Sequence, residues 1–166
     1  GIRILVGVPY EIKAGAKDTW GPNRIESDAV LDIIEKYVKK YDMCYAIHNH
    51  GPDIPNLFPT AEAAMKRIAN RDKRIGVCLD IGHERRAGLD PVAFIRRHAD
   101  RIFDVHLKNI KIDPVKNIAM EGPRGELDIP GIFQALADIG FDGYCLIEFE
   151  KDFDQNEVPL AESIGY

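Results

Sequence analysis

The sequence predicts an α/β fold with a parallel sheet, because short apolar segments typical of strands alternate with amphipathic segments typical of helices along its 166 residues. Two further observations narrow the architecture. Histidines and carboxylates stand where strand after strand ends, and no GxGxxG loop follows the first strand. Both favour part of a (β/α)-barrel, while an open, doubly wound sheet remains the alternative.

The first strand is predicted at residues 2–8, where the run IRILVGV is largely apolar and rich in β-branched side chains. A run of this kind is typical of a strand that is buried on both faces. Four further buried strands are expected at residues 43–48, 75–80, 102–107 and 144–149. Helical segments between them provide the right-handed crossovers that parallel neighbours require.

Four helices are predicted between these strands from their apolar spacing and their capping residues. In the first, apolar side chains recur at helical spacing over residues 30–41, with Ser27 or Asp28 available as the N-cap. The others are expected at residues 61–69 after Thr60, at 92–98 after Asp90-Pro91, and at 132–139 between Asp128 and Gly140.

The composition predicts one globular domain over residues 1–166, with 45% hydrophobic residues for its core. The 22 basic and 27 acidic residues give a net charge of −5, and no basic run or basic face is visible, so neither nucleic acid nor a membrane is expected as a partner. No apolar stretch approaches the roughly 18 residues of a membrane span. Cys44, Cys78 and Cys145 each fall in a predicted strand, which indicates reduced core thiols and a cytoplasmic protein.

Four ligand-type side chains stand at the ends of four successive predicted strands: His48, Asp80, His106 and Glu148. Side chains alternate between the two faces of a strand, and each of these residues shares a face with the small or medium residues two positions earlier. The four therefore fit the mouth of a barrel above its packed interior. Taken alone, each has an ordinary explanation: a histidine could have its hydrogen bonds met within the protein, Asp80 could cap a helix, and Glu148 could be a solvated carboxylate at a strand end. Together they predict one divalent metal site, for which Mn²⁺, Co²⁺, Zn²⁺ or Fe²⁺ suits the two nitrogens and two carboxylates better than Ca²⁺.

Four other side chains are candidates for binding a substrate. His50 and His83 follow ligand positions by two or three residues and could contact substrate or support the ligands, although ordinary loop histidines are the alternative. Arg124 lies in the long loop after the fourth strand, where it could hold substrate oxygens or be a solvated arginine. Lys108 could polarise a substrate oxygen, or it could pair with a carboxylate for structural reasons.

Several stretches together resemble the sugar phosphate isomerase/epimerase family with the xylose isomerase-like TIM barrel, in its HNH-type branch. They cover most of residues 43–166: AIHNHGP, RIGVCLDIGH followed by GLDP, RIFDVHLKNI, and GPRGELDIPGIFQAL followed by GYCLIEFEKD. No single stretch would suffice, and the set as a whole is specific.

The resemblance implies one divalent metal ion, most often Mn²⁺ with Zn²⁺, Co²⁺, Mg²⁺ or Fe²⁺ as alternatives, held by the four strand-end residues. It also implies that His83 and Arg124 contact a sugar or keto sugar. The family's chemistry is proton transfer beside a sugar carbonyl, which produces epimerisation, aldose–ketose isomerisation or dehydration of a keto-inositol. In that chemistry Glu148 is the expected base, with His48 or His50 as its partner.

Two departures from the family pattern affect this expectation. Many family members carry a glutamate at the position of His48, and histidine there removes half of a two-glutamate mechanism, so a lyase that needs one base is an alternative to an isomerase. The family's barrel has eight strands and about 250 residues, whereas this chain corresponds to strands four to eight. A homo-oligomer or a missing N-terminal segment is therefore expected.

A partial barrel leaves two further hypotheses open. A truncated barrel could be a non-catalytic module that serves in assembly or binding. An endonuclease of the same barrel type is the other hypothesis, and the negative net charge with no basic loop argues against it.

Overall fold

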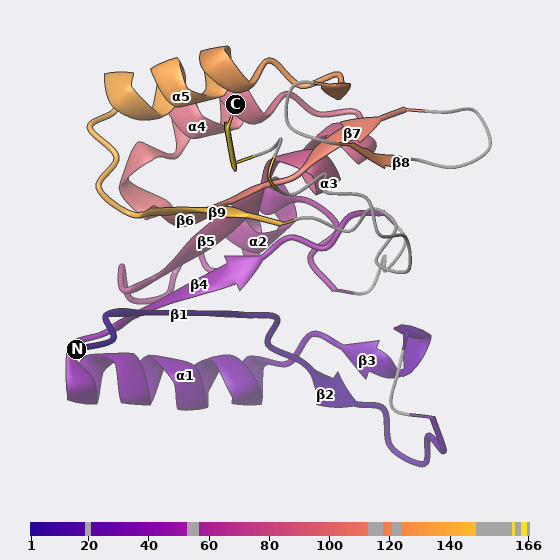
Figure 1. The fold of residues 1–166 in the computed structure, drawn as a ribbon. Helices are drawn as coiled ribbons and strands as arrows, with labels where there is room; N and C mark the ends of the chain where they lie inside the picture. The colour runs from indigo at the N-terminus through magenta and orange to yellow at the C-terminus, as the bar shows by residue number, and fades with distance from the viewer. Residues whose placement is uncertain are drawn as a thin grey trace.

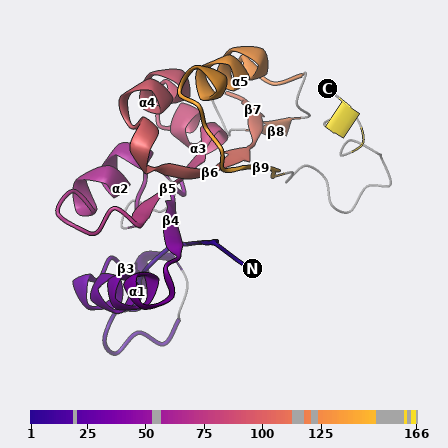
Figure 2. The same ribbon diagram turned by 90° about the vertical axis from the view of Figure 1, so that its left-hand side faces the viewer.

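The computed structural model describes residues 1–18, 21–52, 57–112, 118–120, 124–148, 161 and 164–165. Five parallel strands form its main sheet, in the order β1-β4-β5-β6-β9. Figure 2 shows these strands as a C-shaped half-barrel, which confirms the predicted partial barrel. The strands are β1 (Ile4–Gly7), β4 (Cys44–His48), β5 (Ile75–Asp80), β6 (Ile102–Leu107) and β9 (Tyr144–Ile147).

Helices α1, α2, α4 and α5 lie around the outside of this half-barrel (Figures 1 and 2). The helices are α1 (Asp28–Tyr41), α2 (Ala61–Arg67), α3 (Ile81–Arg86), α4 (Pro91–Arg97) and α5 (Ile129–Asp138), with short 3₁₀ turns η1 (Gly21–Asn23) and η2 (Ala99–Arg101). Within the described residues, no helix combines the length and the apolar character needed to cross a bilayer.

The predicted capping residues begin the helices as expected. The side chains of Ser27, Thr60, Asp90 and Asp128 each accept a hydrogen bond from a backbone N–H in the first turn of the helix that follows. An acceptor at this position satisfies one of the N–H groups that a helix start leaves unpaired, which is worth about 1 kcal/mol. Helix α5 starts three residues before the predicted position, because Asp128 caps it directly at Ile129.

The core lies between the sheet and its outer helices, where Ile47, Val77, Leu79 and Val105 are fully buried. All six residues of β5 are buried, as expected for a strand with parallel neighbours on both sides.

The prediction that all five strands are buried is wrong for the two outer strands. Leu5 and Val6 of β1 are 45% and 39% exposed, and Tyr144 and Leu146 of β9 are 59% and 48% exposed. In the described residues each of these strands pairs on one side only, so part of its apolar surface has no covering element. Both strands are also shorter than predicted, and Phe149 lies outside the described residues.

One helix and four short strands lie in segments for which no helix or strand was predicted. Helix α3 begins immediately after Asp80. Two short antiparallel pairs, β2 (Glu11–Ile12) with β3 (Arg24–Ile25) and β7 (Asn109–Lys111) with β8 (Ile118–Met120), project from the ends of main-sheet strands. The three cysteines are free thiols as predicted, although Cys78 alone is fully buried while Cys44 and Cys145 are partly exposed.

Candidate metal centre

The four predicted ligand residues meet at the carboxyl ends of β4, β5, β6 and β9. One ligand atom from each of them lies within 4.8 Å of the others: His48, Asp80, His106 and Glu148. The register explains this, because Asp80 pairs with His106 and His106 with Leu146, so Glu148 follows two positions later on the same face. Strand parity in the sequence therefore predicted the right face.

The two carboxylate oxygens of Asp80 have different partners: Oδ1 caps helix α3, and Oδ2 faces the cluster. Its Oδ1 accepts a hydrogen bond of 2.7 Å from the backbone N–H of His83, which caps α3. Its Oδ2 faces His48 Nε2 at 3.4 Å and Lys108 Nζ at 3.4 Å. Asp80 is fully buried, so the cap holds the carboxylate in one orientation and leaves a single oxygen directed at the cluster.

Glu148 is held by two donors from β6 and its C-terminal end. His106 Nδ1 lies 2.6 Å from Glu148 Oε2, and Lys108 Nζ lies 2.7 Å from Glu148 Oε1. Burial acts to raise the pKa of Glu148, but the hydrogen bonds from His106 and Lys108 outweigh burial and hold this pKa well below its usual range. Burial likewise acts to lower the pKa of His106, and Glu148 outweighs it, so that pKa is raised. Glu148 is therefore an ionised carboxylate.

This donor set fits a divalent transition-metal ion. Two imidazoles and two carboxylates supply borderline nitrogen and hard oxygen donors, and the cluster contains no thiolate. Both Glu148 Oε2 and Asp80 Oδ2 approach His48 Nε2, at 3.7 and 3.4 Å. Their oxygens lie within 4.8 Å of each other, and two carboxylates this close together need a cation between them or protons on them. Lys108, only 2% exposed, supplies one positive charge, and a metal ion would supply the rest.

His83 and His50 form a second layer beside the cluster. Their rings stack with centroids 5.1 Å apart, and His83 Nε2 lies 3.7 Å from Asp80 Oδ2. Burial lowers the pKa of His83 to about 4, so its imidazole is neutral at pH 7. Gly51 has a φ of +80°, and a Cβ there would lie 2.7 Å from His83 Nδ1, so only glycine lets the chain pass this ring.

His50 carries an unused polar atom. Its Nδ1 is buried and has no hydrogen-bond partner among the described residues. Burial, with His48 nearby, lowers the pKa of His50. A neutral imidazole with a free nitrogen can hydrogen-bond a polar ligand.

Arg124 is also predicted to contact substrate. It is exposed, and it precedes Gly125, which packs against the buried amide of Asn109. Its contact with substrate stays a prediction.

Sequence reasoning missed two buried polar residues behind the cluster. Asn49 is fully buried, and its amide bonds both backbone groups of Asp80. Glu84 is 1% exposed, and burial raises its pKa to about 7. The position of Asn49 between two histidines was the one available clue; the partners of both residues are distant in sequence.

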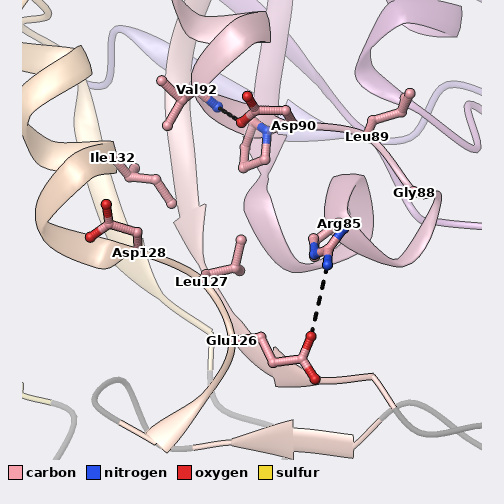
Figure 3. A pocket seen from close by; sticks show the side chains of 10 residues that line it. Arg85, Gly88, Leu89, Asp90, Val92, Glu126, Leu127, Asp128 and Ile132 are labelled. Atoms are coloured by element: carbon pink, nitrogen blue, oxygen red, sulfur yellow. Dashed lines mark hydrogen bonds and ion pairs between the residues drawn. The ribbon is translucent and has the colours of Figure 1, made fainter.

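A separate pocket of about 340 Å³ lies between α3 and the first turns of α4 and α5 (Figure 3). Across it, Arg85 faces Glu126 at 3.9 Å. The other two carboxylates in its lining, Asp90 and Asp128, cap α4 and α5. Their capping roles account for them, and none of the four cluster residues lines this pocket.

Comparison with known proteins identifies the class. The family model described as the xylose isomerase-like TIM barrel matches residues 9–166, so the chain belongs to that family. The HNH-type branch, suggested by AIHNHGP, stays a prediction.

Two curated relatives are similar over most of this chain. The rhizopine catabolism protein MocC of Rhizobium meliloti is 30% identical over 82% of this chain and 46% of its own length. The inosose dehydratase of Clostridium tetani is 28% identical over 74% of this chain and 45% of its own length. The chain therefore spans about half the length of the curated relatives it matches.

The fold is also found in solved structures. The crystal structure of the IolI protein with a binding zinc atom has a TM-score of 0.65 at 20% identity, covering 89% of this chain and 54% of that chain. A likeness at this identity supports the barrel fold alone.

Proposed function

We propose that residues 1–166 form a single (β/α)-barrel-type domain of a metal-dependent enzyme, which transfers a proton beside the carbonyl of a sugar or keto sugar. The observation that carries the proposal is the convergence of four ligand atoms within 4.8 Å at the carboxyl ends of four strands. Catalytic residues of such barrels stand at that end. The relatives named MocC and inosose dehydratase support a small polyhydroxylated substrate.

His48, Asp80, His106 and Glu148 would hold the metal ion, and Mn²⁺ is our first choice, with Zn²⁺, Co²⁺, Fe²⁺ or Mg²⁺ as alternatives. A bound divalent ion would polarise a carbonyl and stabilise the negative charge that develops as the neighbouring C–H loses its proton.

The chain's own residues would perform the proton transfer. Glu148 is ionised, because the hydrogen bonds from His106 and Lys108 outweigh burial and lower its pKa, and its Oε1 is oriented by Lys108 Nζ at 2.7 Å. It can accept a proton, with His48 as the second acid–base group. Neutral His83 and the free Nδ1 of His50 would bind substrate hydroxyls, and Arg124 would bind an outer substrate oxygen.

The same proton abstraction can begin either of two kinds of reaction, and our first proposal is isomerisation or epimerisation. In that reaction the proton returns to carbon. Dehydration is the second candidate, favoured by the relatives named inosose dehydratase. There the adjacent hydroxyl leaves as water, and one base with one acid suffices.

The experiment tests metal binding and proton transfer together. Protein loaded with Mn²⁺ or Zn²⁺ should retain about one ion per chain by elemental analysis. His106→Ala should lose the ion, whereas His98→Ala should keep it, because His98 pairs with Glu62 at 3.0 Å outside the cluster.

The loaded protein is then incubated in D₂O with an inosose and with a ketohexose. Isomerase or epimerase activity gives an isomer of the substrate that carries deuterium on carbon. Dehydratase activity gives a product that has lost one water. A loaded protein that exchanges no C–H proton of either compound contradicts the proposed chemistry and favours the non-catalytic module.

A further inference from the structure

Asn49 joins the strand ends that carry two of the proposed metal ligands. It directly follows His48, it is fully buried, and its side chain reaches across to β5. Its Oδ1 accepts a hydrogen bond of 2.8 Å from Asp80 N, and its Nδ2 donates to Asp80 O at 3.2 Å. The amide thus occupies both main-chain groups of Asp80 and continues the β4–β5 ladder by one side chain.

Glu84 fixes the orientation of this amide. Its Oε2 accepts a hydrogen bond of 3.3 Å from Asn49 Nδ2 and another of 2.8 Å from Ala61 N at the start of α2. Because the same Oε2 also accepts from Ala61 N, it faces Nδ2 as an acceptor, and a flipped amide would bring Asn49 Oδ1 against it. The network therefore connects β4, β5, α3 and α2, and its two polar side chains are 0% and 1% exposed.

The consequence falls on the Asp80 carboxylate. Asn49 holds the Asp80 backbone on one side, while the α3 cap engages Oδ1 on the other. These contacts leave the carboxylate one position, with Oδ2 3.4 Å from His48 Nε2. Without Asn49, two main-chain groups and one Glu84 oxygen would lose buried partners, and the strand end would have to shift to regain them.

We propose that Asn49 is a positioning residue for the metal centre, acting through Asp80 and held in register by Glu84. This inference rests on the proposed function, since it assigns Asn49 to the metal site that function requires. Residues behind metal ligands that orient them typically change metal affinity by about 10–100-fold when lost.

The test compares substitutions of residues that hydrogen-bond the two ends of β5, Asp80 at one end and Ile75 at the other. Asn49→Leu preserves approximate side-chain volume without polar atoms, and Asn49→Ala is a second variant that removes the same contacts. The matched control is Arg101→Met, because Arg101 is 8% exposed and bonds Ile75 O through Nε at 2.9 Å at the opposite end of the strand. Each protein is titrated with Mn²⁺ and with Zn²⁺ by calorimetry, and with Co²⁺ while its visible absorption is recorded.

Both Asn49 variants should bind Mn²⁺ and Zn²⁺ about 10–100-fold more weakly than the wild type, with a changed Co²⁺ spectrum because the Asp80 ligand has moved. Arg101→Met should lose thermal stability but keep the wild-type affinity and spectrum. A folded Asn49 variant with wild-type affinity and spectrum overturns the inference and leaves the proposed function standing. A wild type that binds none of the three ions overturns both.

Discussion

Asp80 is the residue whose two oxygens have separable roles, which makes its substitution informative. Asp80→Asn keeps an oxygen for the α3 cap but removes the charge that faces His48 and Lys108. We expect metal affinity to fall by more than about 100-fold. Losing a residue that only orients a metal ligand lowers affinity by up to about 100-fold, and losing a ligand itself should lower it further. The metal-free Asn variant should stay folded.

Elemental analysis after dialysis and thermal melting of the metal-free protein measure these two effects. Asp90→Asn is the control, because Asp90 caps α4 in the same manner, through Val92 N at 2.9 Å, and lies outside the cluster. Full metal occupancy in Asp80→Asn would remove Asp80 from the ligand set.

Lys108 is, after His106, the second hydrogen-bond donor that lowers the pKa of Glu148 in the metal-free protein. Lys108→Met removes one of the two hydrogen bonds that lower the pKa of Glu148, so the carboxyl should titrate at higher pH than in the wild type. Carbon-13 NMR of labelled glutamate measures this, and Glu148→Gln identifies the resonance. Lys39→Met, which removes an exposed partner of Glu35, should leave Glu148 unchanged. An unmoved Glu148 titration in Lys108→Met would show that His106 alone sets it.

Residue-level prediction succeeded where one rule decided the outcome. Alternation along parallel strands placed His48, Asp80, His106 and Glu148 on one face, and the structure brings them together. It failed for Asn49 and Glu84, since their roles depend on hydrogen bonds to segments more than 20 residues away. Composition and periodicity describe only neighbouring residues, so they cannot predict hydrogen bonds between distant segments.

The α2–α3 junction should make stability depend on pH through Glu84. Burial raises the pKa of Glu84 from 4.5 to about 7 in the folded protein, so between these values the folded state binds a proton that the unfolded state releases. Stability attributable to Glu84 is therefore present below pH 4.5 and is lost as pH rises to about 7. The loss is roughly 3 kcal/mol at most.

Urea unfolding at several pH values, for the wild type and for Glu84→Gln, measures this effect. The difference between the two proteins is the relevant quantity, because the lowered pKa of His83 acts in the opposite direction, adding stability as pH rises through about 4 to 6.5. A wild type and a Glu84→Gln variant with parallel pH profiles would contradict a raised pKa at Glu84.

The loop after β4 depends on Gly51 for two separate reasons. Gly51 and Gly88 have φ of +80° and +79°, but a Cβ would meet His83 only at Gly51 and nothing within 4 Å at Gly88. Gly88→Ala should therefore lose about 1–2 kcal/mol from backbone strain, and Gly51→Ala should lose more and displace the His83 ring. Nitrogen-15 NMR of the imidazoles would detect that displacement. Equal losses with an unchanged His83 spectrum would contradict it.

Element-level prediction identified the N-caps of α1, α2, α4 and α5, but it missed α3 and was wrong about the burial of the two outer strands. An N-cap depends only on a side chain and the backbone N–H groups two or three residues later, so the sequence alone can predict it. The N-caps of these four helices are Ser27, Thr60, Asp90 and Asp128. Burial of a strand depends instead on which neighbours it has, and β1 and β9 have one each in the described residues. The same apolar run, such as IRILVGV, serves a central or an outer strand equally well.

For the whole molecule, the open half-barrel predicts association. Val6 of β1 pairs with Ala46, and Leu146 of β9 pairs with His106, so both face the inside of the half-barrel, where they are 39% and 48% exposed. Among the described residues β1 and β9 each pair on one side only, and apolar surface next to such strand edges favours further strand pairing. We therefore expect the isolated 166-residue chain to self-associate as its concentration rises.

Analytical ultracentrifugation over a wide concentration range tests this expectation. Val6→Lys and Leu146→Lys should each shift the distribution toward monomer, because a charge on the inner face would have to be buried on association. Phe133→Lys is the matched control: Phe133 is 46% exposed on α5, outside the half-barrel, and its substitution should leave association unchanged. A wild type that stays monomeric at every concentration would show that this chain tolerates an open inner face. Equal effects of all three lysines would indicate association through general surface hydrophobicity instead of the inner face.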